Sequence, residues 1–247
     1  MSKYSGLWKI ARFNWPWYAA AVATTAAGIL LLQSGALGGR WSALGTTGLF
    51  VANFWLLVSL AVSHYVYDRS AVARGAWLDR VEPTSVHRAA IFHAGQNEAS
   101  EAVARVLLSA DIQTFDFYDP ERNGTPSLKR ARALAERHAV AIVPDKIPLN
   151  DAALDLGLIV FAAHEIRRDE ARAAFFRELA RALAPTGRLV IVEHLRNGWN
   201  FLAYGPGAFH FLSRKTWRRS FADAGLKLLR ETSCTPFVRV FELGKAP

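Results

Sequence analysis

The stretch LDLGLIVFAAHEIRRDEARAAFFRELARALAPTGRLVIV, residues 154–192, carries the strongest structural pattern in this chain. It opens with an apolar run over 154–162 and closes with a second apolar run over 188–192. Between them, Asp169 caps a segment whose apolar side chains share one helical face: Phe175, Phe176, Leu179 and Leu183. Pro185-Thr186-Gly187 ends that helix. Two buried strands joined by an amphipathic helix predict a parallel sheet covered on both faces.

Strands and helices continue to alternate on the N-terminal side of this unit. Predicted strands cover 89–93, 112–117 and 139–143, predicted helices cover 97–108 and 127–138, and a short amphipathic helix covers 71–80. The end of the chain departs from the alternation, because a helix over 214–224 is followed by strands over 226–231 and 237–243. The sequence therefore predicts a doubly wound α/β sheet with an antiparallel finish.

Two uncharged stretches, 13–39 and 41–63, precede this domain. Each is long enough to cross the roughly 30 Å hydrocarbon core of a bilayer as a helix. The short, glycine-containing connection between them predicts a transmembrane hairpin with helices at about 15–34 and 43–64. The predicted organisation is a cytoplasmic N-terminal segment over 1–13, the hairpin over 14–66 and a folded domain over 67–247. A buried helix pair, or a cleaved signal peptide for the first stretch, is the alternative.

Basic residues flank the hairpin at both of its outer ends. They are Lys3, Lys9 and Arg12 before it and Arg69, Arg74 and Arg80 after it. The positive-inside rule then predicts a multi-pass protein of the cytoplasmic membrane, with both termini and the folded domain in the cytoplasm. A net charge of +9 suits a domain that lies on an anionic leaflet, and the sequence carries no nucleic-acid motif.

Cysteine and histidine usage argues against a metal centre. The single cysteine, Cys234, excludes an internal disulfide and a cysteine-based metal cluster. The seven histidines are scattered, without the spacing of a ligand helix. His164 and Glu165 are adjacent, so their side chains are expected to point in different directions. No metal site is predicted.

From Asp151 to His194 the sequence resembles the class I S-adenosylmethionine-dependent methyltransferases, most closely the ubiquinone/menaquinone-methylase-like group. The matching runs are LDLGLIVF at 154–161, HEI at 164–166, FRELARALAPTGRL at 176–189 and VE at 192–193. The resemblance extends over roughly Tyr67 to the C-terminus. It implies a Rossmann-like, seven-stranded sheet whose last strand is antiparallel, here preceded by the two-helix transmembrane hairpin.

The resemblance also implies a site for S-adenosylmethionine, although the glycine loop departs from the family pattern. That loop is HAGQNEA over 93–99, in which His93 stands at the acidic position, Gly95 is the remaining glycine, and Asn97 and Ala99 replace the later glycines. A carboxylate after the second strand would bind the ribose; Asp119 is the first choice and Asp116 the second. A plain turn at Asp119-Pro120 is the alternative. Two further positions implied for the cofactor are Asp145 and Phe161.

Candidate catalytic residues follow the later strands, at the edge where open α/β sheets place their sites. His164 follows one strand and Glu193 ends the next, so either is a candidate base or substrate contact. The aromatic segment 200–211 contributes Tyr204 and His210 and suits a hydrophobic acceptor with one polar head. The alternatives are a helix cap for His164 and, for the aromatic segment, a lid that packs on the bilayer or the hairpin.

These observations together predict an enzyme of the methyltransferase class (EC 2.1.1.-), anchored in the membrane. Its acceptor would be a lipid, a quinone or another amphiphile, and its cofactor S-adenosylmethionine. The alternative is an inactive methyltransferase-fold subunit that serves as a scaffold or assembly partner. In either case membrane lipids are partners, and the hairpin would suit a membrane-protein partner or a second copy of the chain.

Overall fold

The structure, a computed structural model, describes residues 5–79, 81–121, 126–132 and 139–246. Within these residues seven strands form one sheet, in the order β3-β2-β1-β4-β5-β7-β6. The strands are β1 (Arg88–His93), β2 (Asp111–Asp116), β3 (Val140–Ala141), β4 (Leu154–Val160), β5 (Leu183–His194), β6 (Leu226–Ser233) and β7 (Val238–Lys245). The pairs from β3 to β5 are parallel, and β7 runs antiparallel to both β5 and β6. The predicted mixed sheet with an antiparallel last strand is confirmed.

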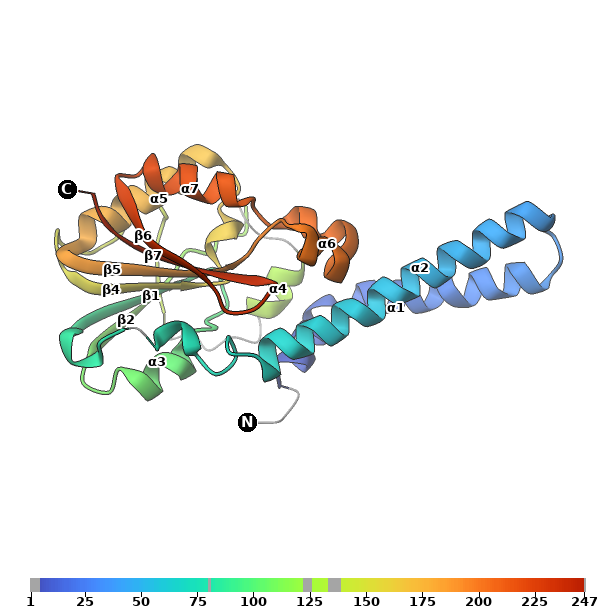
Figure 1. Cartoon of the computed structure of the whole chain (residues 1–247), viewed down its shortest axis with the longest axis horizontal. Helices are drawn as coiled ribbons and strands as arrows, with labels where there is room; N and C mark the ends of the chain where they lie inside the picture. The colour runs from blue at the N-terminus through green and yellow to red at the C-terminus, as the bar shows by residue number, and fades with distance from the viewer. Residues whose placement is uncertain (1–4, 80, 122–125, 133–138, 247) are drawn as a thin grey trace.

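Helices cover both faces of the sheet, as the strand–helix alternation predicts (Figure 1). One face carries α5 (Asp169–Ala182) and α7 (Arg214–Ala222), whose buried rings include Phe175, Phe176 and Trp217. The other face carries α3 (Ser100–Val106) and the segment before β1, with Trp77 and Val103 in a second core cluster. Because both faces of β4 are buried, its near-continuous apolar sequence is explained.

The two apolar N-terminal stretches form a hairpin that projects away from the sheet domain (Figure 1). Helix α1 (Ser5–Gln33) and helix α2 (Gly39–His64) pack against each other, and Asn53 of α2 donates to the Thr25 hydroxyl of α1 at 3.1 Å. Among the described residues, these are the helices long and apolar enough to cross a membrane. Helix α1 begins before the predicted residue 15, because the polar segment ahead of the apolar run is also helical and lies against the domain.

Several local expectations differ from the structure. Asp169 is not the cap of α5 but its first residue, after the N-cap Arg168, and α5 ends at Ala182, so Leu183 and residues 185–187 belong to β5. The amphipathic helix predicted over 71–80 is wrong: Gly75 adopts φ 78°, and only a 3₁₀ turn, Ala76–Leu78, forms. The predicted strand over 139–143 shortens to β3, which pairs with the end of β2 at the sheet edge. The helix predicted over 127–138 is observed as α4 (Pro126–Arg132), and its remainder lies outside the described residues.

Candidate functional site

A cavity of about 400 Å³ lies between the hairpin and one end of the sheet. The sheet domain contributes the loop after β1, the end of β4, His194 from the end of β5, and the aromatic segment. That segment consists of α6 (Gly198–Tyr204) and the 3₁₀ helix Gly205–His210. The hairpin contributes the start of α1 and the end of α2. The volume falls in the range of small-molecule sites, and the strand ends are where open α/β sheets bind ligands.

The loop after β1 makes a tight turn at Gly95. Gly95 adopts φ 80°, a left-handed conformation that residues with a side chain rarely adopt. Its N–H donates to Asp116 Oδ1 at 2.8 Å. The same oxygen accepts from the Tyr118 N–H at 2.9 Å, and the Arg132 guanidinium pairs with Oδ2. Asn97 accepts from backbone N–H groups at the start of α3. A buried carboxylate and an Asx-type turn at Asn97 therefore hold this loop in place.

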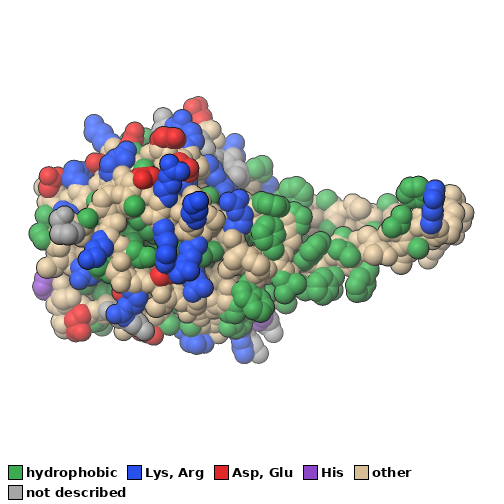
Figure 2. Space-filling model, turned by 45° about the horizontal axis from the view of Figure 1, so that its top comes forward, with side chains coloured by type: hydrophobic (Ala, Val, Ile, Leu, Met, Phe, Trp, Pro, Cys, Tyr) green, Lys and Arg blue, Asp and Glu red, His purple; other side chains and the backbone are tan. Residues whose placement is uncertain are grey.

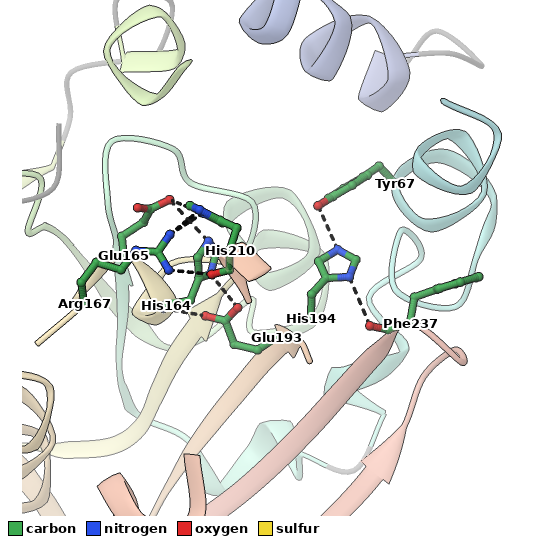
Figure 3. A network of polar contacts seen from close by, with 8 residues as sticks. All are labelled: Tyr67, His164, Glu165, Arg167, Glu193, His194, His210 and Phe237. Carbon is green, nitrogen blue, oxygen red and sulfur yellow. Dashed lines mark hydrogen bonds and ion pairs between the residues drawn. The ribbon is translucent and has the colours of Figure 1, made fainter. Parts of the chain in front are cut away.

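An ion network follows β4 at the cavity wall (Figure 3). His164 Nδ1 lies 2.8 Å from Oε2 of Glu193, and the His164 backbone N–H donates to the other oxygen at 3.2 Å. His164 Nε2 lies 3.4 Å from Oε1 of Glu165. Burial alone would lower the pKa of His164, but the carboxylates of Glu193 and Glu165 raise it to about 10. At neutral pH His164 is therefore an imidazolium that bridges two carboxylates, and it must lose that proton before it can act as a base.

His194, the residue after Glu193, differs from His164 in that its pKa is lowered. Its Nδ1 lies 3.1 Å from the carbonyl oxygen of Phe237, and its Nε2 lies 3.1 Å from the hydroxyl of Tyr67 (Figure 3). The ring is stacked between Phe161 and Phe211, at centroid distances of 4.9 and 4.8 Å. Burial, assisted by the positive charge of His164, lowers the pKa of His194 to about 3. This imidazole is neutral throughout the physiological range.

Three donors that the sequence did not predict to converge lie within 4.8 Å of one another: His164, Glu165 and His210. The 3₁₀ turn Ala163–Glu165 brings the first two together, so their adjacency in sequence does not separate them. Such a donor set could hold a metal ion. In this structure, however, the Arg167 guanidinium contacts both ring nitrogens of His210 and donates to its carbonyl oxygen at 2.6 Å. Arg167 and the protonated His164 thus both bring positive charge to this cluster.

Among the predicted cofactor residues, Asn97 and Phe161 line the cavity, and Phe161 does so with φ 52°. His93 is buried in β1, with Nδ1 3.7 Å from Asp116. Neither Asp116 nor Asp119 belongs to the cavity lining, and Asp119 lies in a turn where its side chain accepts from the Glu121 N–H at 2.8 Å. Asp145 is exposed in the turn between Val143 and Lys146. The structure thus places Asp116, the second choice, at the end of β2 beside the loop.

Two of the predicted catalytic residues, His164 and His210, line the cavity together. Tyr204 also lines it, and burial raises its pKa to about 12. Glu193 is fully buried and does not line the cavity, but it contacts the His164 ring that does. Sequence reasoning missed Tyr67, which reaches the cavity from the hairpin. The sequence offers little signal for it, because a tyrosine shortly after an apolar span is also typical of an interfacial aromatic belt.

The residues around the loop after β1 fit S-adenosylmethionine, the cofactor that the resemblance implies. The left-handed turn at Gly95 opens the chain toward the cavity, and Asp116 offers a carboxylate at the end of β2. Gln96 and Asn97 line the cavity beside that turn, and Phe161 lines it from the end of β4. This donor set fits a nucleoside-bearing cofactor that enters along the loop, provided that Arg132 yields Oδ2 of Asp116.

Comparisons with known proteins agree with this architecture. Residues 123–191 match a family model described as a methyltransferase domain. The structure of the mitomycin 7-O-methyltransferase MmcR aligns with a TM-score of 0.57 and 18% identity, covering 100% of this chain and 74% of that chain. An S-adenosylmethionine-dependent methyltransferase from Clostridium acetobutylicum aligns with a TM-score of 0.51 and 8% identity, covering 74% of this chain and 97% of that one. A search of the curated proteins finds no match. At these identities the chain shares the methyltransferase fold.

Proposed function

We propose that this protein transfers the methyl group of S-adenosylmethionine to an amphiphilic acceptor at a membrane surface. One observation carries the proposal: a single cavity is walled on one side by the ends of an apolar hairpin and on the other by the ligand-binding edge of a methyltransferase-fold sheet. Both walls mix polar and apolar side chains, with Lys9, Phe13 and Ser63 on the hairpin side and rings such as Phe161 and Phe211 on the sheet side, and an amphiphilic acceptor matches such a lining. A lipid or a lipid-like quinone has this character.

In this proposal the cofactor lies along the loop after β1. The N–H groups and side chains of Gln96 and Asn97 would contact its amino-acid part, Asp116 its ribose, and Phe161 its base or sulfur region. When bound, the group supplies an electrophilic methyl on a sulfonium. The residues of this chain then have to align the acceptor with that methyl and keep water out, which are the main demands of such a displacement.

The surface around the hairpin supports delivery of the acceptor from a bilayer. Three large apolar side chains of the aromatic segment are exposed, Trp199 at 57%, Leu202 at 55% and Phe209 at 65%. This segment packs on the second hairpin helix, where Trp55 Nε1 donates to the Leu202 carbonyl at 3.2 Å. Apolar side chains cluster where the hairpin meets the domain and continue along it (Figure 2). An apolar patch of this kind that is continuous with a membrane-length hairpin suits the interface of a leaflet.

The charge pattern sets the proposed orientation. Lys9, Arg12, Arg69 and Arg74 lie at the domain end of the hairpin, whereas its loop end carries Arg40. The positive-inside rule then places the domain and both termini on the cytoplasmic side of the inner membrane. The basic domain, with its net charge of +9, would be attracted to anionic headgroups.

Calorimetric titration of S-adenosylmethionine into the full chain in detergent tests the enzyme proposal. We expect saturable binding, weakened at least tenfold by Asp116→Asn and unchanged by Asp119→Asn, because only Asp116 adjoins the loop. The thermal unfolding of both variants is measured in parallel, so that a collapsed loop is recognised. Label from the methyl group of the cofactor should then enter the organic phase of a membrane-lipid extract. No saturable binding to the wild type would overturn the proposal.

A scaffold without cofactor is the second candidate, and one observation favours it. Both oxygens of Asp116 are already bonded, to two backbone N–H groups and to Arg132, and the Asn97 side chain is turned toward α3. The side chains of Asp116 and Asn97 thus have hydrogen-bond partners within the protein without a ligand. For a scaffold, the same titration should give no heat, and the hairpin should hold a second copy or another membrane protein in a cross-linking experiment.

A further inference from the structure

A hydrogen-bond chain runs from the buried carbonyl of Phe237 through His194 to the Tyr67 hydroxyl at the cavity. Its buried end determines which atom donates and which accepts in each bond. The carbonyl oxygen of Phe237 can only accept, so His194 Nδ1 must carry the proton that it donates across 3.1 Å. Asn200 Nδ2 donates to the same carbonyl at 2.9 Å, which fills its second lone pair. A neutral imidazole protonated at Nδ1 has a bare Nε2. The His194 tautomer is therefore set from behind, away from the cavity.

The bare Nε2 in turn sets the direction of the Tyr67 hydroxyl. This oxygen lies 3.1 Å from Nε2 and must donate to it, because two lone pairs cannot bond to each other. A hydroxyl has one proton, so that proton is committed. The Tyr67 hydroxyl then presents only lone pairs toward the cavity. Among the described residues, His194 is the one hydrogen-bond partner of this hydroxyl. The exposed end of the chain is an acceptor.

The hairpin holds Tyr67 in this position with contacts of its own. Tyr67 belongs to a π-helical turn, Tyr65–Arg69, that continues α2, and such turns recur at functional sites. The neighbouring Asp68 accepts from the Gly6 and Leu7 N–H groups of α1 at 2.6 and 2.9 Å. Gly6 itself lies so close that a Cβ there would be 2.6 Å from the Tyr67 Cβ. Both hairpin helices therefore fix the residue.

The surroundings of the hydroxyl are aromatic. The Tyr67 ring meets Phe161 edge-on at 5.3 Å, and Tyr204 packs against His194 at 5.7 Å. The proton of the Tyr67 hydroxyl is used in the bond to His194, so its lone pairs are open to a ligand that carries a hydrogen-bond donor.

We propose that Tyr67 is a residue of the acceptor subsite, and that it selects a nucleophile bearing a hydrogen-bond donor, an O–H or an N–H. This inference rests on the proposed function and names the class of its substrate: hydroxyl or amine amphiphiles bind, and ethers and other molecules without a donor are rejected. The donated hydrogen bond also orients the nucleophile, since its lone pairs then point away from the Tyr67 oxygen. On transfer the acceptor oxygen or nitrogen bonds to the methyl carbon, the bond from that carbon to sulfur breaks, and the acceptor's proton leaves to solvent. The turn that continues the hairpin thus supplies a recognition group, and the hairpin positions that group in addition to serving as an anchor.

Three matched probes test the selection: 4-octylphenol, 4-octylaniline and 4-octylanisole, which share a tail and ring but differ in the donor. Binding to the full chain in detergent is measured by calorimetry, with partition into empty micelles subtracted. We expect the phenol and the aniline to bind about tenfold more tightly than the anisole, the ratio that corresponds to one neutral hydrogen bond. An affinity for the phenol alone or the aniline alone would identify the acceptor as a hydroxyl or an amine.

Two variants and one control make the result decisive. Tyr67→Phe should bind all three probes with the affinity that the wild type has for the anisole. Tyr65→Phe is the control: it lies on the same turn but is 44% exposed, and it should behave as the wild type. His194→Phe keeps the stacked ring but frees the Tyr67 proton, so the anisole should bind more tightly than in the wild type. Equal binding of the three probes to the wild type, or discrimination that survives Tyr67→Phe, would overturn the inference. None of these readouts uses the cofactor, so a failed methyl-transfer proposal would show separately, as absent cofactor binding.

Discussion

Replacing Glu193 by glutamine tests the buried ion pair behind the cavity. Glu193 is fully buried and bonds both the ring and the backbone N–H of His164. The pKa of His164 rises from 6.5 to about 10 in the folded protein, so its protonated form stabilises the fold. That stabilisation is present in full below pH 6.5 and is lost as the pH rises through about 10. Glutamine keeps the shape of the side chain but removes the charge.

The magnitude follows from the pKa. A rise from 6.5 to about 10, at about 1.4 kcal/mol for each pH unit, sets a ceiling of about 5 kcal/mol. Breaking a buried pair by removing one partner costs about 3 to 5 kcal/mol, because the other charge is left uncompensated. The glutamine oxygen can still accept from His164, and Glu165 remains nearby. We therefore expect Glu193→Gln to lower the free energy of unfolding by about 3 kcal/mol at pH 6.

Urea unfolding in detergent from pH 6 to pH 10 measures this difference. The gap between wild type and variant should shrink above pH 7 and be almost closed at pH 10, where His164 is losing its proton in the wild type. Glu242→Gln, which removes a partly exposed pair with Arg230 at 3.9 Å, serves as the control and should change stability by less than about 1 kcal/mol. A gap that stays constant over this range, or a wild-type His164 that titrates near 6.5 by NMR, would refute the reasoning.

Three further substitutions probe other contacts. Gly6→Ala places a Cβ 2.6 Å from that of Tyr67, so we expect a thermal unfolding temperature several degrees lower; Gly198→Ala, which has no atom within 4 Å, should leave it unchanged. Trp217→Ala empties a fully buried site under α7 and should lower the free energy of unfolding by about 3 to 5 kcal/mol in urea, and a loss below about 1 kcal/mol would mean that the core closes around it. Gly95→Ala puts a Cβ at φ 80° and should cost about 1 to 2 kcal/mol in the same assay; an unchanged midpoint would show that the loop relaxes.

The sheet was predictable from sequence because its signals are local. The runs that became β4 and β5 are apolar on both faces, and the segment between them repeats its apolar residues at helical spacing. Weak signals failed where tertiary packing decides the outcome. Trp77 and Leu78 were assigned to an amphipathic helix, but they enter the core through a 3₁₀ turn after the left-handed Gly75. At this position burial, and not the helical period, determines the backbone.

The site was predictable only in part, because its residues meet through topology. The strand-end rule placed His164 and Glu193 at one edge of the sheet, and the structure brings them to hydrogen-bond distance. The same rule could not separate Asp116 from Asp119. The difference lies in the register of β2: Asp116 is the last paired residue, opposite His93, whereas Asp119 falls in the turn beyond it.

Tyr67 shows the limit of sequence reasoning most clearly, because its partner His194 is 127 residues away. Their contact exists only because the hairpin folds back onto the sheet edge, where Arg130 donates to the Phe13 carbonyl at 2.6 Å and Trp55 donates to that of Leu202. A bare anchor needs no such bonds, since apolar length alone holds a span in a bilayer. Directed hydrogen bonds between the hairpin and the domain instead fix the distance from Tyr67 to the end of β5. The hairpin and the sheet are therefore built as one unit, and the cavity is defined by both.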